Sequence, residues 1–546
     1  SDTLLLKNTS QPRLGFRVNK IYIDSYYMDP QTQKYPEANR ELMKQFNEGM
    51  LVFNYIGHND PEVGFTGEGL FSRYEMDHLT NTRLPLFITI TCDYCQFDAE
   101  DVSAGENVFL NPSAGAIALI TTTRVVYTDG NDKINRRLMK RLLERDSNGS
   151  PLRIGDVLKL AKRDFNTEID KNKLNYVLIG DPALKLAYPE HSIQVTRING
   201  NSGKKNIEMI PGKNYTVEGE IRSHQNELLS DFNGYIYYNL YDKEKQFTTL
   251  AHQDKKTWTY THRPDLLTTG KGTIQNGTFR ITVTLPIDNS HSGKSGLLNL
   301  YAYDESGREA NGYTDKLIVS TAVEPITEDI QGPDIEFAGI NDDSFTEGIL
   351  VNNPATFVCK FSDPSGIWSG NSLGKQMTLS LDGACIEENV ARYYKPIAES
   401  EIPEGEFIYP LPRLSNGLHT LTFKVFDTLG NSSEVTIAFE VKENSETYTI
   451  SLEEEPATER ATISCQDQNG NDVTESKHTR ISVTNTLGEE IWSYETTENN
   501  PFPLTWNLQD NNGKRVSAGQ YYCKGYFETS AGTIVTPAKK IVVITQ

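Results

Sequence analysis

LPLFITIT, residues 84–91, decides the fold expected for the first third of the chain. The run is short and almost continuously apolar, which is typical of a strand buried on both faces of a parallel sheet. MLVFNYIG (residues 50–57) and AGAIALITT (residues 114–122) have the same character. Amphipathic helical patterns lie between these runs, so the sequence predicts an α/β arrangement here.

The other elements of this part follow from ordinary end signals. A helix is expected over residues 36–48, because Pro36 suits its first turn and Gly49 suits the residue after its end. The remaining expected elements are a first strand NKIYID (residues 19–24), a basic amphipathic helix KINRRLMKRLLER (residues 133–145), a helix near residues 154–165 and a last strand at residues 176–179.

The helical period disappears after this part, and short alternating strands separated by turns take over. Two polar seams, VEPITEDIQGPD and VKENSETY, divide this remainder into three blocks of sandwich size. The sequence therefore predicts an α/β parallel-sheet part followed by three all-β, immunoglobulin-like sandwich domains. Their expected bounds are residues 1–188, 189–326, 327–444 and 445–546.

The composition narrows the class of partner. The chain of 546 residues carries 53 Lys and Arg against 74 Asp and Glu, a net charge of −21. A polyanion of this size repels phosphate backbones, so no nucleic acid partner is expected. No run approaches the roughly 18 apolar residues of a transmembrane helix, and the opening SDTLLLKNTS lacks the pattern of a signal peptide. The chain is expected to begin as a mature or cut species, and six cysteines are too few for a disulfide scaffold.

Two reactive side chains stand where predicted strands end. His58 follows residues 50–57, in GHND, and Cys92 follows residues 84–91, in TCDYCQFD. The carboxyl ends of neighbouring parallel strands meet at one edge, where such sheets build their sites. A thiol needs a nearby imidazole to take its proton at neutral pH, so this Cys and His suit nucleophilic catalysis.

The same residue types also occur where no nucleophile is needed. Both side chains are common as packed structural residues. Cys92 and Cys95 form a CxxC pattern, which also occurs in dithiol redox sites and as half of a zinc site. No second CxxC and no HxxxH stands elsewhere in the sequence, which disfavours zinc. An incidental disulfide or a pair of free thiols accounts for Cys95 more simply.

NYIGH, TCDYCQFD, AGAIALI and YVLIGDPALKL occur in the order and rough spacing of gingipain-type cysteine peptidases, and residues 19–188 resemble that family. The resemblance implies a caspase-like catalytic sheet, with His58 as general base and Cys92 as nucleophile. It also implies an oxyanion site made by the backbone N–H groups of Asn59 and Cys92. Cys95 stands where the family has a small residue, and Asn59 where it has glycine. Because the family's catalytic domain begins with more sheet, the chain resembles the C-terminal part of a longer polypeptide.

The end of the chain extends the resemblance. WNLQDNNGKRVSAGQYYCKGYF and KKIVVITQ resemble the C-terminal signal domains of proteins exported by the type IX secretion system, and the whole chain resembles the gingipain-like sortases of that system. This implies a cysteine endopeptidase and transpeptidase at the bacterial cell surface, associated with an outer-membrane protein. Its expected substrates are secreted proteins that bear signal domains, and its expected acyl acceptor is an amine linked to lipopolysaccharide. A non-catalytic surface scaffold or adhesin, and a simple protease without transfer, are the alternatives.

No cofactor is expected for this chemistry. Two segments concentrate oxygen-bearing side chains, INDDSFTEG (residues 340–348) and FSDPSGIWSGNS (residues 361–372). Such segments suit a structural calcium ion, and acidic turns of an acidic protein account for them equally well. Cysteine pairing is also left open, for Cys359 with Cys385 and for Cys465 with Cys523.

Overall fold

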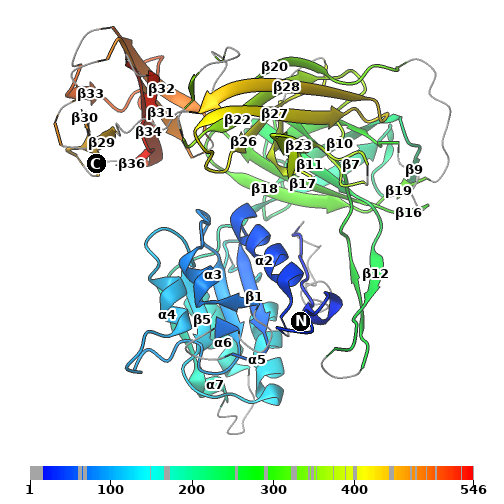
Figure 1. Cartoon of the computed structure of the whole chain (residues 1–546). Helices are drawn as coiled ribbons and strands as arrows, with labels where there is room; N and C mark the ends of the chain where they lie inside the picture. The colour runs from blue at the N-terminus through cyan, green and yellow to red at the C-terminus, as the bar shows by residue number, and fades with distance from the viewer. Residues whose placement is uncertain are drawn as a thin grey trace. The chain divides into compact units, whose positions relative to one another are not determined.

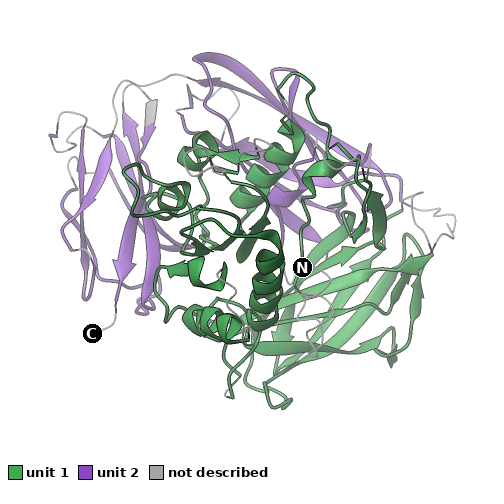
Figure 2. Cartoon of the chain, turned by 90° about the horizontal axis from the view of Figure 1, so that it is seen from below, with its two compact units in different colours: residues 1–327, 370–372 green, residues 328–369, 373–546 purple. Residues whose placement is uncertain are grey.

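The computed structural model divides the chain into two compact units (Figure 2). The first comprises residues 1–327 and 370–372, and the second comprises residues 328–369 and 373–546. The structure describes residues 16–544 except 33, 60–63, 66–69, 148, 165–171, 253–255, 288–292, 321–328, 342–344, 346–349, 352, 373, 388, 398–401, 442–447, 455, 468–469, 472, 474–475, 487, 498–500 and 530–531. Each unit is considered by itself.

A four-stranded sheet organises the start of the first unit (Figure 1). Its strands, in spatial order, are β1 (Val52–Ile56), β4 (Leu86–Ile90), β5 (Ala118–Thr122) and β6 (Tyr176–Ile179). β1, β4 and β5 are parallel, as their apolar sequences predict, whereas β6 runs antiparallel to β5. β4 and β5 are buried at every position, because helices cover both of their faces.

Two apolar clusters fill the space between this sheet and its helices. On one face, Phe53, Tyr55 and Phe87 pack with α2 (Pro36–Glu48), α3 (Arg73–Asp77) and α4 (Ala104–Phe109). On the other, Leu86 and Ile88 pack with α5 (Thr128–Arg141) and α6 (Ile154–Arg163). The alternation along β4 follows from the strand period of two residues. α2 begins and ends where the sequence predicts, with Gly49 at φ +88°.

The strand predicted for NKIYID is wrong. Residues 16–22 have no regular secondary structure, and η1 (Ile23–Ser25) is a 3₁₀ turn. Instead of a sheet neighbour, this segment contacts the connection between β12 (Lys245–Thr248) and β13 (Thr259–His262). The Asp24 carboxylate accepts hydrogen bonds from the backbone N–H groups of Ala251 (2.9 Å) and His252 (2.7 Å). The alternating pattern of NKIYID therefore reflects packing against a distant hairpin.

The rest of the first unit is built around one large sheet. Its order is β10-β15-β14-β11-β17-β18-β7-β8, and a further pairing between β10 and β7 closes it around a single apolar core. This closed sheet differs from the two separate sheets of the predicted sandwich, because β7 pairs with β10 as well as with β18, and the two-residue strand β8 is left at its edge. The remaining elements of the unit are β2 (Gly64–Phe65), β3 (Phe71–Ser72), α7 (Asn172–Asn175), β7 (His191–Ile198), β8 (Asn201–Ser202), β9 (Ile207–Met209), β10 (Asn214–Arg222), β11 (Gly234–Tyr241), β14 (Leu266–Gln275), β15 (Thr278–Thr284), β16 (Lys294–Ser295), β17 (Leu297–Asp304), β18 (Glu309–Thr314) and β19 (Leu317–Val319).

The second unit contains two pairs of sheets, each pair around its own apolar core. The first pair is β20-β22-β26-β25 and β21-β28-β27-β23-β24, and the second is β29-β30-β33 and β32-β31-β34-β35, with β36 paired to β34. The bounds are β20 (Asp334–Ile340), β21 (Leu350–Val351), β22 (Thr356–Ser362), β23 (Thr378–Leu381), β24 (Ala384–Glu387), η2 (Ala391–Tyr393), β25 (Tyr394–Pro396), β26 (Glu404–Pro410), β27 (Gly417–Phe426), β28 (Ser432–Val441), β29 (Thr449–Leu452), β30 (Ala461–Gln466), β31 (His478–Asn485), β32 (Glu490–Thr496), β33 (Leu504–Trp506), β34 (Gly519–Thr529), β35 (Gly532–Val535) and β36 (Lys539–Val543).

Candidate active site

The register between β1 and β4 brings the two predicted catalytic residues to one edge of the sheet. Each paired residue of β1 lies opposite the residue 34 positions later, from Val52 with Leu86 to Ile56 with Ile90. His58 and Cys92 each follow the last paired residue of their strand by two positions. Both residues follow the carboxyl ends of their strands, where open parallel sheets hold their sites.

The turn that carries His58 is fixed by the strand before it. The Tyr55 hydroxyl donates a hydrogen bond to the His58 backbone carbonyl (2.7 Å). A Cβ atom at Gly57 would lie 2.3 Å from that hydroxyl oxygen, so glycine is required for the Tyr55 ring to reach back over the turn. The His58 side chain is exposed. The imidazole is thus accessible while its backbone is held in place.

The turn that carries Cys92 is held by the neighbouring strand β5. The Thr122 hydroxyl donates to the Thr91 carbonyl (2.5 Å), and the Cys95 N–H donates to the Thr122 carbonyl (3.0 Å). Between these contacts Asp93 adopts φ +45°, a left-handed conformation that few residues other than glycine take. Such a sharp turn at the end of a buried strand projects Cys92 from the sheet edge.

The Cys92 thiol is half-buried, and its Sγ donates to the backbone carbonyl of Val126 at 3.4 Å. Among the described residues, no hydrogen bond joins Sγ to the imidazole of His58. Catalytic hydrogen bonds are often long in a structure without substrate and tighten only when substrate binds. Within the same described part, no hydrogen bond to the protein is found for the Asn59 N–H or for the Cys92 N–H.

Cys95 has a different environment from Cys92. It is buried against α4, where a Cβ atom at Gly105 would lie 2.6 Å from the Cys95 Cβ. Burial raises the pKa of the Cys95 thiol to about 11. A thiol that stays protonated and inaccessible is a poor nucleophile. All six cysteines are free thiols, so the structure contains neither the Cys92–Cys95 disulfide nor the pairs left open by the sequence.

Asp98 of the TCDYCQFD motif makes an ion pair across the site. Its two carboxylate oxygens accept hydrogen bonds from Arg124 at 3.0 and 2.6 Å. Arg124 lies two residues before Val126, the acceptor of the Cys92 thiol, so the pair connects the two loops that flank Sγ. Sequence reasoning missed Arg124 and Val126. Asp98 has no basic residue beside it within the TCDYCQFD motif, which was a signal that an arginine pairs with it. The role of Val126 depends on its backbone carbonyl, which every residue has, so the sequence held no signal for it.

A cavity of about 1090 Å³ lies beside β1 in the first unit. Its wall includes Tyr55 and His58 from β1 and the following turn, and Lys256 and Trp258 from the β12–β13 connection. The Lys256 ammonium lies 4.3 Å from the centre of the Trp258 ring. His58 is part of this wall, whereas Cys92 is not.

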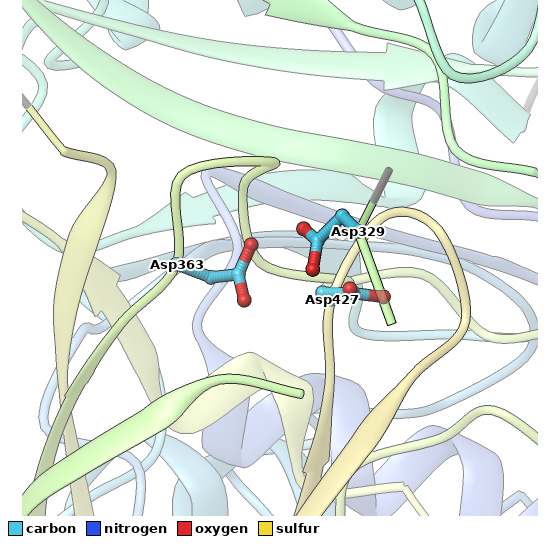
Figure 3. A group of neighbouring side chains, drawn as sticks. All are labelled: Asp329, Asp363 and Asp427. Atoms are coloured by element: carbon cyan, nitrogen blue, oxygen red, sulfur yellow. The ribbon is translucent and has the colours of Figure 1, made fainter. Parts of the chain in front are cut away.

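Three carboxylates of the second unit come together (Figure 3). Ligand atoms of Asp329, Asp363 and Asp427 lie within 4.8 Å of one another. Burial, and then repulsion from the other carboxylates, raises the pKa of Asp363 and of Asp427. Oxygen ligands at this spacing suit a hard cation such as calcium. Asp363 belongs to a segment predicted for calcium, whereas residues 342–344 and 346–349 of the other segment lie outside the described residues.

Comparison with known proteins supports the interpretation of the first part of the chain. Residues 6–187 match the family model Peptidase_C25, that of peptidase family C25. The resemblance of this segment to the gingipain-type peptidases is thereby confirmed. The match covers the whole four-stranded sheet, with His58 and Cys92. The sequence of the chain matches no curated protein.

Three solved structures are similar to the chain. Dimeric latent PorU from Porphyromonas gingivalis is 24% identical, with a TM-score of 0.33, and the match covers 80% of this chain and 41% of PorU. The Arg-specific cysteine proteinase gingipain R is 17% identical, with a TM-score of 0.26, over 52% of this chain and 56% of that one. The complex of Porphyromonas gingivalis RgpB pro- and mature domains is 16% identical, with a TM-score of 0.26, over 52% and 57%. The chain thus spans less than half of the length of PorU. Among the described residues, no helix has both the length and the apolar character needed to span a bilayer.

Proposed function

We propose that the C25 segment is a cysteine peptidase site in which Cys92 is the nucleophile and His58 the general base. The parallel register of β1 and β4 carries the proposal, because it leads His58 and Cys92 to the same sheet edge. The buried thiol of Cys95 leaves Cys92 as the accessible cysteine of the motif. Both backbone N–H groups of the expected oxyanion site lie on the two turns involved, at Asn59 and Cys92.

The reaction follows from these positions. The Cys92 thiol gives its proton to His58, and Sγ attacks the carbonyl carbon of a peptide bond. The N–H groups of Asn59 and Cys92 donate to the oxygen that becomes negative. His58 returns the proton to the departing amine as the C–N bond breaks, which leaves a thioester on Cys92. Water or a second amine then attacks the thioester, and the product is a free carboxylate or a new amide.

The finer proposal concerns which peptide is cut. The resemblance of the motifs and of the chain's end to gingipain-like sortases favours secreted proteins with C-terminal signal domains as substrates. It also favours an amine linked to lipopolysaccharide as acceptor, at the bacterial cell surface beside an outer-membrane protein. The sequence predicts three β-sandwich domains after the catalytic part. In this proposal, these β-domains position the catalytic part. No residue that selects the scissile bond is assigned.

The test is replacement of each motif cysteine in the full-length protein. Cys92→Ala should abolish removal of signal domains from secreted proteins, and Cys95→Ala, its matched control, should change the rate by less than about twofold. Equal loss in both variants would point to a dithiol site instead. Mass spectrometry of the new carboxyl terminus separates the two resolving steps, since an added amine marks transfer and a bare carboxylate marks hydrolysis.

One observation favours a second candidate, a non-catalytic scaffold with a peptidase fold. The Cys92 thiol donates to Val126, and among the described residues it makes no hydrogen bond to His58. If signal domains are removed as fast by Cys92→Ala as by the natural protein, the scaffold is the correct assignment. In that case Cys92 should also react with iodoacetamide with the pH dependence of an ordinary thiol.

A further inference from the structure

The side chain of Asn59 spans the two turns of the proposed site. Its Nδ2 donates a hydrogen bond to the backbone carbonyl of Cys92 at 3.0 Å, across 33 positions of sequence. The opposite orientation of the amide would set Oδ1 against that carbonyl oxygen, so the observed orientation is the one that the contact allows. Asn59 stands where the resemblance to the peptidase family expects glycine, which has no side chain to make this bond.

The bond completes a pair of restraints around Cys92. The peptide plane before the Cys92 Cα is held by the Thr122 hydroxyl, which donates to the Thr91 carbonyl at 2.5 Å. The peptide plane after it is held by Asn59, which donates to the Cys92 carbonyl. With both planes fixed, the two backbone dihedrals of Cys92 are fixed, and so is the direction of its Cα–Cβ bond.

The restraint at Cys92 also bears on the next residue, Asp93, whose backbone is strained. Asp93 holds φ +45°, a conformation that a non-glycine residue keeps only when its surroundings impose it. Asn59 anchors the carbonyl that directly precedes Asp93, and the N–H of Cys95 anchors the turn on its other side by donating to Thr122. Without the amide of Asn59, the turn can relax toward ordinary backbone angles and carry Sγ with it.

We propose that Asn59 is a positioning residue, whose side-chain amide ties the turn of the base to the turn of the nucleophile and thereby sets the approach of Sγ to His58. The proposal rests on the proposed peptidase function. It adds a role for the side chain of a residue whose expected contribution is its backbone N–H alone. Asn59 acts through Cys92, so it should affect the chemical step more than substrate binding.

The experiment compares Asn59→Gly, which is the residue expected from the family, with Asn59→Asp, which keeps the shape and loses the donor. Asn39→Ala is the matched control, because the Asn39 Nδ2 makes the same kind of bond to the Leu70 carbonyl (2.7 Å) on helix α2. For peptide cleavage by the full-length protein, we expect both Asn59 variants to lower kcat about five- to tenfold with KM within about twofold, the loss typical of one hydrogen bond. Asn39→Ala should keep the natural kcat.

A second readout does not require turnover. Alkylation of Cys92 by iodoacetamide, followed by peptide mass spectrometry, reports how well the imidazole promotes the thiolate. At pH 7 we expect Asn59→Gly to react about fivefold more slowly than the natural protein, and at pH 10 the two rates should converge because both thiols are ionised. Equal rates at pH 7, or a natural kcat in Asn59→Gly, would overturn the positioning role. Failure of the natural protein to cleave any substrate would instead overturn the proposed function.

Discussion

Gly57→Ala offers a sharp test of how the His58 turn is built. The new Cβ would lie 2.3 Å from the Tyr55 hydroxyl oxygen and 2.6 Å from Cζ, far inside van der Waals contact. The Tyr55 ring cannot simply swing away, because it is 5% exposed and stacks on Phe65 with ring centres 3.7 Å apart. The ring must therefore shift within a packed core and release its hydrogen bond to the His58 carbonyl.

The expected cost combines two terms. A lost hydrogen bond costs about 1 kcal/mol, and forcing a methyl group into a packed core costs about 1 to 3 kcal/mol. Together they lower the free energy of unfolding of this part by about 2 to 4 kcal/mol, a large share of the stability of an ordinary domain. With a typical urea dependence, the unfolding midpoint should fall by roughly 1 to 2 M.

Cys95 provides a local probe of this change. It is fully buried in the cluster that contains Tyr55 and Phe65, so its labelling by a thiol reagent at rising urea reports the unfolding of that cluster. Tyr55→Phe should lose only the hydrogen-bond term, and Gly57→Ala should cost less in the Tyr55→Phe background, because the closest atom is gone. Gly519→Ala is a control, since the nearest atom to its Cβ lies 4.0 Å away. Natural protection of Cys95 in Gly57→Ala would show that the turn is not built as described.

Three further predictions address the other contacts. At pH 8, iodoacetamide should modify Cys92 within minutes and leave Cys95 unmodified, because burial raises the pKa of Cys95 to about 11. Peptide mass spectrometry measures the labelling of both cysteines, and equal labelling would contradict the burial of Cys95. Arg124→Gln should slow peptide cleavage severalfold, because it removes the ion pair to Asp98. Adding 1 M salt should also slow cleavage by the natural protein, because salt screens that ion pair. With a chelator present, Asp363→Asn should raise the unfolding midpoint of the second unit, and the rise should be larger at pH 7 than at pH 3. The pKa of Asp363 is raised in the folded state, so this carboxyl destabilises the fold at any pH at which it is ionised in the unfolded chain. A lower midpoint at pH 7 would refute the repulsion among the three carboxylates.

The sequence determined those features that depend on neighbouring residues along the chain. The almost continuously apolar runs at residues 84–91 and 114–122 form strands buried on both faces, because such runs tolerate helices on either side. Pro36 and Gly49 fixed the ends of α2, because each acts through its own backbone angles. His58 and Cys92 stood at strand ends in the sequence itself, which was enough to make them candidates.

Tertiary structure decided everything that depends on pairing between distant segments. The adjacency and register of β1 and β4, the antiparallel direction of β6 and the closure of β10 onto β7 are choices of partner, which strand propensity does not specify. NKIYID has the alternation of a strand, yet it packs against a hairpin more than 220 residues later along the chain. The amide of Asn59 became informative only when folding brought the Cys92 carbonyl within reach, because a hydrogen bond across 33 residues has no local sequence pattern.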